Sequence, residues 1–245
     1  METELGQRKH LFTNKQLWAL LVPVVVEQIL NSLMGTADTM MVSNVGSAAI
    51  SAVSLVDSIN VLVIQVFAAL AAGGTIICSQ YMGQKNVKNA TDAAKQLIFI
   101  ITAIAVVLTA VCVVFQIPLL HLIFGKVEEE VMTNSEVYFL YTALSFPFIA
   151  VFNAGSSVFR AQENTSLPMT ISVISNIMNI VGNAILIFGF HMGVAGAALS
   201  TLISRIFCAI VVMYFLRNPK EKICVRNYIK IRPDRHKIKM ILALG

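Results

Sequence analysis

Residues 17–42 read LWALLVPVVVEQILNSLMGTADTMMV, an apolar run that contains two acids, Glu27 and Asp38. A transmembrane helix needs about 20 mainly apolar residues, so this run is long enough to cross a bilayer. An acid at mid-membrane costs about 2.5–3.5 kcal/mol on insertion scales, while each Leu, Ile, Val or Phe returns about 0.3–0.6 kcal/mol. The eleven such residues of the run barely offset two acids. We therefore expect both carboxylates to face protein or water and to serve a function.

The whole chain has the composition of an integral membrane protein. Of its 245 residues, 57% are hydrophobic and 13% are charged, and the mean hydropathy is +0.77. Apolar stretches of spanning length recur along the sequence, which a soluble domain of this size does not show. The sequence therefore predicts an all-α integral membrane protein with a bundle of six transmembrane helices. The first run is too long and too polar for a signal peptide, so we expect it to be retained.

Six spans can be placed along the chain. Their predicted bounds are Leu17–Val42, Ala48–Tyr81, Leu97–Phe115, Val137–Phe159, Leu167–Gly189 and Val194–Leu216. Pro147 is expected to kink the fourth span, because proline cannot donate a backbone hydrogen bond to the preceding turn. The chain then divides into an N-terminal segment (1–16), a membrane lobe (17–216), a basic connector (217–237) and the start of a seventh span (238–245).

The loop charges support this span count and predict an orientation. Sixteen of the 18 Lys and Arg residues lie in the N-terminus, the second and fourth loops and the tail, all on one side of a six-span topology. The other side has Lys126, and Arg205 lies within a span. Because basic loops stay in the cytoplasm, we expect a multi-pass plasma-membrane protein with both termini cytoplasmic. These loops explain most of the net charge of +5, so we expect contact with anionic membrane lipids and no nucleic-acid partner.

Polar side chains form one stripe on the first span and another on the fifth. At 100° per residue, Glu27, Asn31 and Asp38 fall within about 40° of one another. The stripe of the fifth span, about 60° wide, consists of Ser172, Asn176, Asn179 and Asn183. Such stripes commonly form hydrogen bonds between helices, and this interpretation stays open for Asn176 and Ser172.

Four polar side chains lie at similar depths in the outer half of the bundle. With a rise of 1.5 Å per residue, Asp38 lies about 6 Å below the outer end of its span, and Thr201 about 10 Å. Asn183 lies about 9 Å down and Asn179 about 15 Å. Carboxylate, amide and hydroxyl oxygens are what a hard cation or a proton relay requires. We therefore predict a site for a coupling cation, H+ or Na+, at Asp38, Asn179, Asn183 and Thr201.

Four secondary candidates are Glu27, Asp57, Asn176 and Arg205. Asp57 either joins the same site or is a structural acid that bonds to Ser54, Ser58 or a neighbouring helix. Glu27 lies about 22 Å from the outer end, too deep for this layer, and is either a cytoplasmic-side gate or a hydrogen-bond anchor. Arg205 is close enough to the inner face to snorkel, which favours a structural role.

The sequence has no signature of a soluble enzyme. It contains no P-loop, no dinucleotide glycine fingerprint, no paired-Cys metal pattern and no HExxH motif. An intramembrane enzyme would need a nucleophile or a metal set at one depth, and Asp38 and Asp57 have no such partner set. We therefore expect neither enzyme activity nor a cofactor, apart from the coupling ion.

The motifs around the predicted site are specific. They are Pro23 with MGTADTMM (34–41), RAQ (160–162) with PM (168–169), NIVGN (179–183) and GVAGAALST (193–201). Together they resemble the amino-terminal half of multidrug and toxic compound extrusion (MATE) transporters over nearly the whole chain. The spacing is distinctive, because an acid in span one is combined with two amide or acid positions four apart in span five. A Thr follows the first of these positions by 22 residues.

The resemblance implies a secondary antiporter that exports lipophilic, amphipathic cations in exchange for sodium ions or protons. It also implies two six-helix lobes around a central cavity, with the ion site in the amino-terminal lobe. The family's acid falls on Asp38, its span-five pair on Asn179 and Asn183, and its Thr on Thr201. Some relatives carry Asp where Asn183 stands, so this chain has one carboxylate fewer, and the choice between protons and sodium stays open.

The family has twelve spans, whereas this sequence ends at Gly245, shortly after an apolar run begins at Ile238. The resemblance thus implies that a second six-helix lobe is missing from this chain and that residues 217–237 connect the lobes. We expect a piece of a longer transporter, with a native half-size protein as the alternative.

Two other functions remain as alternatives. A flippase for lipid-linked saccharides shares the lobe architecture, but it would favour a basic groove for a pyrophosphate group. Here Arg205 is the one cation within the spans, against three acids. A non-transporting membrane subunit that packs on another protein would also suit a single lobe. An export site for cations fits the sequence better.

Overall fold

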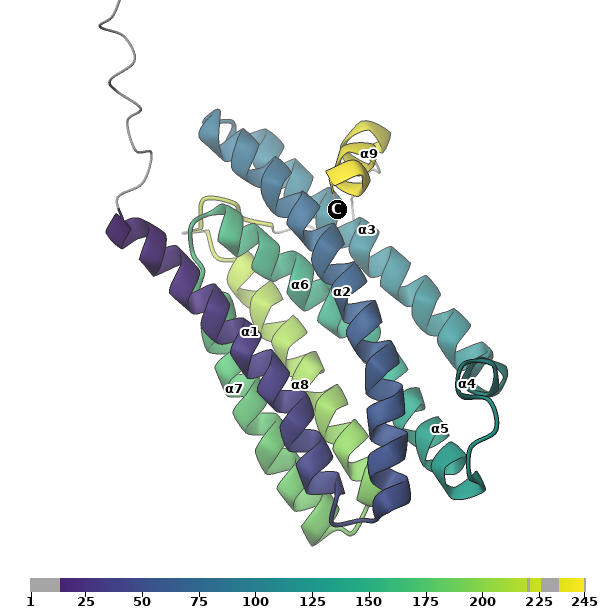
Figure 1. Cartoon of the computed structure of the whole chain (residues 1–245). Coiled ribbons are helices and arrows are strands. Elements are labelled where there is room, and N and C mark those ends of the chain that lie inside the picture. Colours follow the sequence, from purple (N-terminus) through teal and green to yellow (C-terminus); the bar gives the residue numbers. More distant parts are fainter. Residues whose placement is uncertain (1–13, 220, 226–233, 245) are drawn as a thin grey trace, which may run out of the picture.

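The computed structural model describes residues 14–219, 221–225 and 234–244, which form a bundle of long helices (Figure 1). No β-strand occurs in this part of the chain. The helices, including one π-helix (η1), are α1 (Asn14–Val42), α2 (Ser47–Gly83), α3 (Val87–Val114), α4 (Gln116–Phe124), α5 (Glu129–Leu144), α6 (Phe146–Ala161), α7 (Ser166–Asn183), η1 (Ala184–Gly189), α8 (Gly193–Leu216) and α9 (Arg235–Leu244).

The long helices confirm the predicted membrane fold. Among the described residues, five stretches are long and apolar enough to cross a bilayer, namely Leu17–Val42, Ser47–Gly83, Val87–Val114, Ser166–Gly189 and Gly193–Leu216. Helices α5 and α6 pass the same test together, as one bent span. The chain is therefore an all-helical membrane protein with six spans when the bent pair is counted as one.

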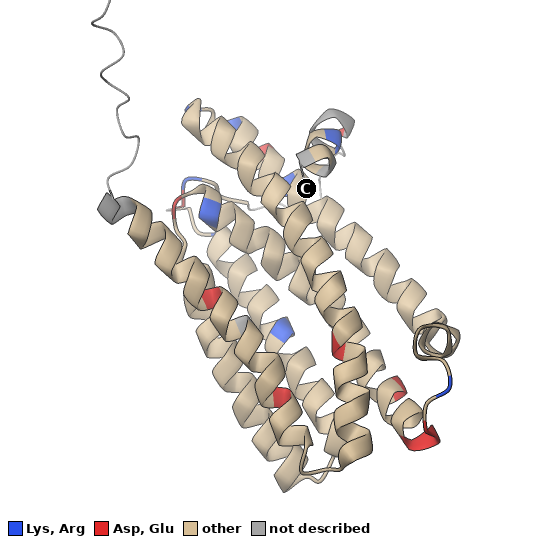
Figure 2. Cartoon of the chain, in the orientation of Figure 1, with Lys and Arg blue, Asp and Glu red and all other residues tan. Residues whose placement is uncertain are grey.

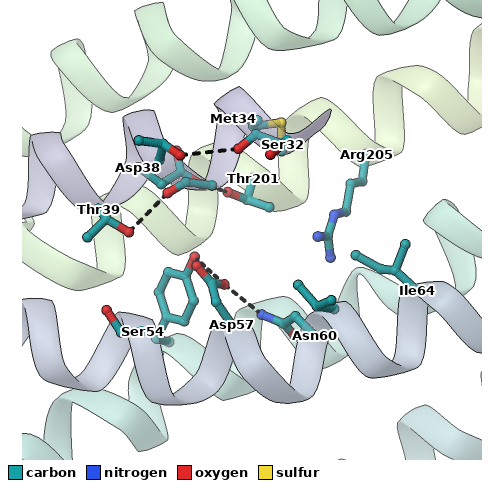
Figure 3. Close-up of a pocket in the computed structure, with 14 residues that line it drawn as sticks. Ser32, Met34, Asp38, Thr39, Ser54, Asp57, Asn60, Ile64, Thr201 and Arg205 are labelled. Carbon is teal, nitrogen blue, oxygen red and sulfur yellow. Dashed lines mark hydrogen bonds between the residues drawn. The ribbon is translucent and has the colours of Figure 1, made fainter. Parts of the chain in front are cut away.

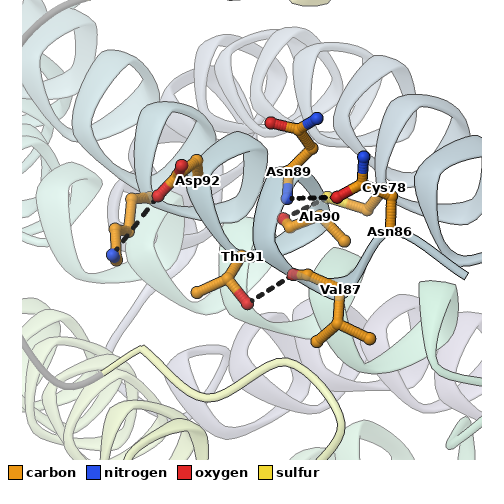
Figure 4. Close-up of polar contacts among 8 residues, drawn as sticks. Cys78, Asn86, Val87, Asn89, Ala90, Thr91 and Asp92 are labelled. Atoms are coloured by element: carbon orange, nitrogen blue, oxygen red, sulfur yellow. Dashed lines mark hydrogen bonds and ion pairs between the residues drawn. The ribbon is translucent and has the colours of Figure 1, made fainter.

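The third helix begins earlier than the predicted span. The predicted span begins at Leu97, but α3 begins at Val87. The side chain of Asn86 caps this helix, because its Oδ1 accepts a hydrogen bond from the backbone N–H of Asn89 at 3.2 Å (Figure 4). Lys95 also pairs with Asp92 at 3.5 Å. A cap and side-chain pairs stabilise these polar turns, which hydropathy alone does not detect. The short helix α4 beyond Phe115 was not predicted either.

The fourth span is broken, as Pro147 predicted. Helices α5 and α6 meet at Ser145 with a bend of 42°. Pro147 lies in the first turn of α6, where its missing N–H costs no intrahelical hydrogen bond. The Ser145 hydroxyl donates to the Thr142 carbonyl and thereby satisfies one of the groups that the break exposes.

The spans pack as two groups joined by α8. Helix α1 packs chiefly against α7, whereas α2 packs against α3, α5 and α6. Helix α8 contacts α5, α6 and α7, so it lies between the groups (Figure 1). Because α1 packs on α7 far more than on α2, space remains between α1 and α2 for the cavity described below.

The charged residues of the described segments lie mostly at the two ends of the bundle (Figure 2). Lys and Arg gather mainly at the end that carries the α2–α3 turn and α9. The ten-residue helix α9 packs against α2 and α3, with Ile241 fully buried. Residues 1–13, residues 220 and 226–233 of the connector and Gly245 lie outside the described residues, and the predicted domain bounds and seventh span stay predictions.

Candidate functional site

The structure brings the four predicted ion-site residues together from three helices. The Asn183 amide donates to Asp38 Oδ1, and the Thr201 hydroxyl lies 3.3 Å from Asp38 Oδ2. Asn179 Nδ2 in turn donates to Thr201 Oγ1 at 3.1 Å. All four side chains are at most 3% exposed. The predicted convergence is confirmed, and it links α1, α7 and α8 through side chains.

A close approach of α7 and α8 makes this network possible. Gly182 precedes Asn183, and a Cβ atom built on it would lie 2.3 Å from Ser200 Oγ. The Ser200 hydroxyl donates to the Asn179 carbonyl at 2.8 Å. A glycine at position 182 therefore lets the helices come close enough for Asn179 to reach Thr201.

One oxygen of the network has no partner. Asn183 is fully buried, and its Oδ1 makes no hydrogen bond within the described residues. A buried oxygen without a donor costs about 1–3 kcal/mol. The carboxylate of Asp38 and the Asn183 oxygen thus offer ligand atoms suited to a small hard cation, or acceptors for a proton and its water.

A cavity of about 500 Å³ opens beside Asp38 (Figure 3). Fourteen residues line it, among them the polar or charged residues Ser32, Thr36, Asp38, Thr39, Ser54, Asp57, Asn60, Tyr138, Thr201 and Arg205. This volume lies within the usual range of sites for drug-sized ligands, about 300–1,000 Å³. The ion-site network therefore forms part of the wall of a ligand-sized cavity.

Asp57 lines the same cavity from α2. Its Oδ1 accepts hydrogen bonds from Asn60 Nδ2 and from the Tyr138 hydroxyl, each at 3.2 Å. The predicted bond to a neighbouring helix is therefore confirmed, because Tyr138 belongs to α5. Of the alternative partners, Ser54, Ser58 and a neighbouring helix, the structure shows the last, and the Ser58 hydroxyl donates instead to the Ser54 carbonyl.

Glu27 lies away from this cavity and forms an ion pair. Arg160 Nη2 lies 2.8 Å from Glu27 Oε2, and the Glu27 side chain is only 3% exposed. Arg160 lies in the last turn of α6, so the pair ties α1 to α6. Two roles were predicted for Glu27, a cytoplasmic-side gate and a hydrogen-bond anchor, and this contact agrees with the anchor.

Arg205 is buried and does not snorkel, although its contact with Ser145 is compatible with the predicted structural role. Its side chain is 8% exposed, and Nη1 donates to the Ser145 hydroxyl at 2.6 Å at the break of span four. The break leaves a hydroxyl that can accept this bond inside the bundle. Arg205 therefore faces the cavity instead of the inner membrane surface.

Asn176 bonds within its own helix rather than across helices. Its Nδ2 donates to the Ser172 carbonyl at 2.8 Å, and its Oδ1 has no partner in the described part of the chain. Asn176 lines a smaller cavity of about 90 Å³ together with Ser172 and Arg205. Its neighbour Ser175 does bond across helices, because its hydroxyl on α7 donates to the Ser204 carbonyl of α8 at 3.3 Å.

The two residues that hold Asp57 in the cavity wall, Asn60 and Tyr138, were not predicted from the sequence as site residues. Asn60 lies three residues after Asp57, a helical spacing that would have placed both on one face of α2. Tyr138 was predicted only as part of the fourth span, and no pattern in the sequence indicates its contact with a residue 81 positions away.

A family model described as MatE matches residues 23–185, about two thirds of the chain. The chain belongs to the MatE family. The matched region includes Asp38, Asp57, Asn179 and Asn183 and ends before Thr201. Members of this family are membrane transporters.

Curated relatives of this MatE chain cover it almost completely. The uncharacterized transporter YisQ of Bacillus subtilis is 29% identical over 234 residues, which are 94% of this chain and 50% of YisQ. The probable multidrug resistance protein NorM of Thermotoga maritima is 29% identical over 214 residues, or 84% of this chain and 45% of NorM. The MatE chain thus spans about half the length of the curated relatives it matches.

Solved structures show the same fold. A crystal structure of MATE in the bent conformation matches 94% of this chain with a TM-score of 0.86 and 23% identity, over 51% of its own length. An outward-facing multidrug resistance MATE family transporter matches 93% of this chain with a TM-score of 0.84 and 22% identity, over 50% of its length. The MatE chain therefore has the fold of one half of such a transporter.

Proposed function

We propose that this MatE lobe belongs to an antiporter that exports lipophilic organic cations in exchange for a coupling cation bound at Asp38. The observation that carries the proposal is the buried network of Asp38, Asn179, Asn183 and Thr201 in the wall of a ligand-sized cavity. An ionisable residue buried in a membrane protein is costly and is typically part of an ion or substrate pathway.

The coupling ion is H+ or Na+, and we favour the proton. Asp38 is the one carboxylate of the network, so a sodium ion would have one full negative charge and several neutral oxygens around it. A single carboxylate that is protonated and deprotonated in turn would suffice for proton exchange. The unpartnered Asn183 oxygen is compatible with either ion.

The charge of the cavity favours a cationic substrate. Its charged lining residues are Asp38, Asp57 and Arg205, so the two acids outweigh one guanidinium when both are ionised. A flippase for a pyrophosphate-linked lipid would need a cavity in which basic residues outweigh acidic ones. The multidrug names of NorM and other relatives agree with export of small organic compounds.

The proposed antiporter needs a second lobe. Alternating access comes from rocking one bundle against another around a site near their interface. The relatives are about twice as long as the matched region, which supports a partner lobe for this one. The excess of Lys and Arg in the predicted inner loops supports a plasma-membrane orientation with both termini in the cytoplasm.

Dye efflux tests this function. The full gene product that contains residues 1–245 is expressed in cells that lack their own exporters, and ethidium accumulation is measured. Wild-type protein should lower accumulation, and Asp38→Asn should abolish this effect, because the change removes the charge and keeps the shape.

The matched control is Asp92→Asn, which neutralises an acid at the polar start of α3, away from the cavity. It should export like wild type. If Asp38→Asn protein is present at normal levels and still exports at the wild-type rate, Asp38 is not the coupling carboxylate.

A further inference from the structure

The cavity has a second polar wall that faces Asp38. Asp57 projects from α2, whereas Asp38 projects from α1 on the other side of the cavity (Figure 3). The Asp57 carboxylate is held by Asn60 on its own helix and by Tyr138 on α5. Two helices thus fix its position, and the residues around it differ from those around Asp38.

This wall also contains an unsatisfied amide oxygen. Asn60 is 3% exposed and lines the cavity, and its Oδ1 has no hydrogen-bond partner among the described residues. Its Nδ2 already donates to Asp57. The wall therefore combines a carboxylate with a free amide oxygen, a pair of groups that can accept hydrogen bonds from an ammonium or bind another cation.

The nearby guanidinium does not neutralise either acid by direct contact. Arg205 donates to the Ser145 hydroxyl, and within the described residues it forms no salt bridge with Asp38 or Asp57. Both carboxylates therefore remain available for ligands. Because the guanidinium still contributes its charge, the lining has one net negative charge when both acids are ionised.

We propose that Asp57 and Asn60 bind the charged group of the exported organic cation, while Asp38 binds the coupling ion. This inference rests on the proposed function and adds where the substrate binds. The apolar part of the substrate would lie against Met34, Val61 and Ile64, which line the same cavity.

The single net charge of the cavity makes the two ligands compete. One monovalent cation, at either acid, neutralises the lining, and a second would leave it positive in a site partly shielded from water. Binding of the coupling ion at Asp38 should therefore weaken binding of the organic cation at Asp57. Exchange transport requires such competition. Arg205 makes it possible, because its positive charge offsets one of the two acids and leaves room for only one bound cation.

Ethidium binding to the purified full gene product tests this assignment, with binding followed by fluorescence. Asp57→Asn should weaken ethidium binding about tenfold or more, because it removes the charged partner of a partly desolvated ion pair. Asp38→Asn should bind ethidium about as weakly as the ion-loaded wild type, because its lining is already neutral, and its affinity should no longer change when protons or sodium ions are added. Asp92→Asn should behave like wild type in both measurements.

Asn60→Asp provides a second variant if Asp57→Asn protein does not fold. It adds a carboxylate to the same wall, so it should tighten ethidium binding, and in the double variant with Asp57→Asn it should restore much of the affinity. Wild-type ethidium affinity in Asp57→Asn, or no gain in ethidium affinity in Asn60→Asp, would overturn the assignment of the substrate to Asp57 and Asn60 but not the proposed function. Absence of ethidium binding by the wild-type protein would overturn the proposed function as well.

Discussion

At the residue scale, the acids inside the bundle are each held by a polar partner from another helix. Asp38 bonds to Asn183, Asp57 to Tyr138 and Glu27 to Arg160. These contacts satisfy the carboxylates in a region where water is scarce, and each also ties two helices together. The three acids nevertheless differ, because only Asp38 and Asp57 line the cavity.

The Glu27–Arg160 pair should stabilise the lobe without taking part in transport chemistry. The Glu27 side chain is 3% exposed, whereas that of Arg160 is 26% exposed and can reach water. Arg160→Met should therefore cost more stability than Glu27→Gln, about 2–4 against about 1–2 kcal/mol, because it leaves a buried carboxylate unpaired. Thermal unfolding of the purified full gene product in detergent measures both losses.

The double variant Glu27→Gln/Arg160→Met is the control for this pair. It should be more stable than Arg160→Met alone, because no buried charge remains. Melting temperatures of both single variants equal to that of the wild type would show that the ion pair does not stabilise the lobe.

The sequence predicted which four residues of the proposed ion site lie together better than it predicted their surroundings. Asp38, Asn179, Asn183 and Thr201 could be grouped because helical spacing and depth are both readable from a membrane sequence. The partners of Asp57 and Arg205 could not, since Tyr138 and Ser145 come from a span whose bend changes which residues face the cavity. Contacts between distant helices depend on this tertiary geometry.

At the element scale, the site depends on how closely α7 and α8 pack. Gly182→Ala places a methyl group 2.3 Å from Ser200 Oγ, which cannot move without losing its bond to the Asn179 carbonyl. We expect a loss of about 1–3 kcal/mol in stability and weaker ion-coupled export, because Asn179 and Thr201 are pushed apart. Thermal unfolding and ethidium efflux of the full gene product measure the two effects.

Gly83→Ala is the matched glycine control. No atom lies within 4 Å of a Cβ built at Gly83, which ends α2. This variant should keep wild-type export and stability within about 0.5 kcal/mol. If Gly182→Ala behaves in the same way, close packing of α7 and α8 is not needed for the site.

The helices themselves were largely predictable, and the errors have a common cause. Hydropathy detects the apolar core of a span, so it gave the first, second, fifth and sixth spans to within a few residues. It missed the polar beginning of α3 and the separate helix α4, because these depend on caps and turns at the edge of the apolar region. The break at Ser145 was indicated by Pro147.

At the scale of the whole molecule, the charge distribution predicts which end of the lobe faces the cytoplasm. Single-cysteine versions of the full gene product, one with Lys126→Cys and one keeping Cys224, should differ in intact cells. An impermeant thiol reagent should label position 126 and not position 224, because the basic loops stay inside. Labelling of position 224 without cell lysis would reverse the orientation.

The overall lobe architecture followed from the span count and the motifs, and the solved MATE structures agree with it. The position of the cavity did not follow from the sequence. It depends on α1 packing against α7 while α2 packs against α5 and α6, and hydropathy does not reveal which helices are neighbours.

The central claim is that Asp38 couples a cation gradient to export of an organic cation. Its most direct test is ethidium transport into inside-out vesicles that contain the full gene product, driven by a proton gradient at equal sodium or by a sodium gradient at equal pH. The account predicts transport driven by the proton gradient in the wild type and in Asp92→Asn, and none in Asp38→Asn. Transport driven only by the sodium gradient would identify sodium, and not the proton, as the coupling ion. Gradient-driven transport by Asp38→Asn at the wild-type rate would contradict the claim.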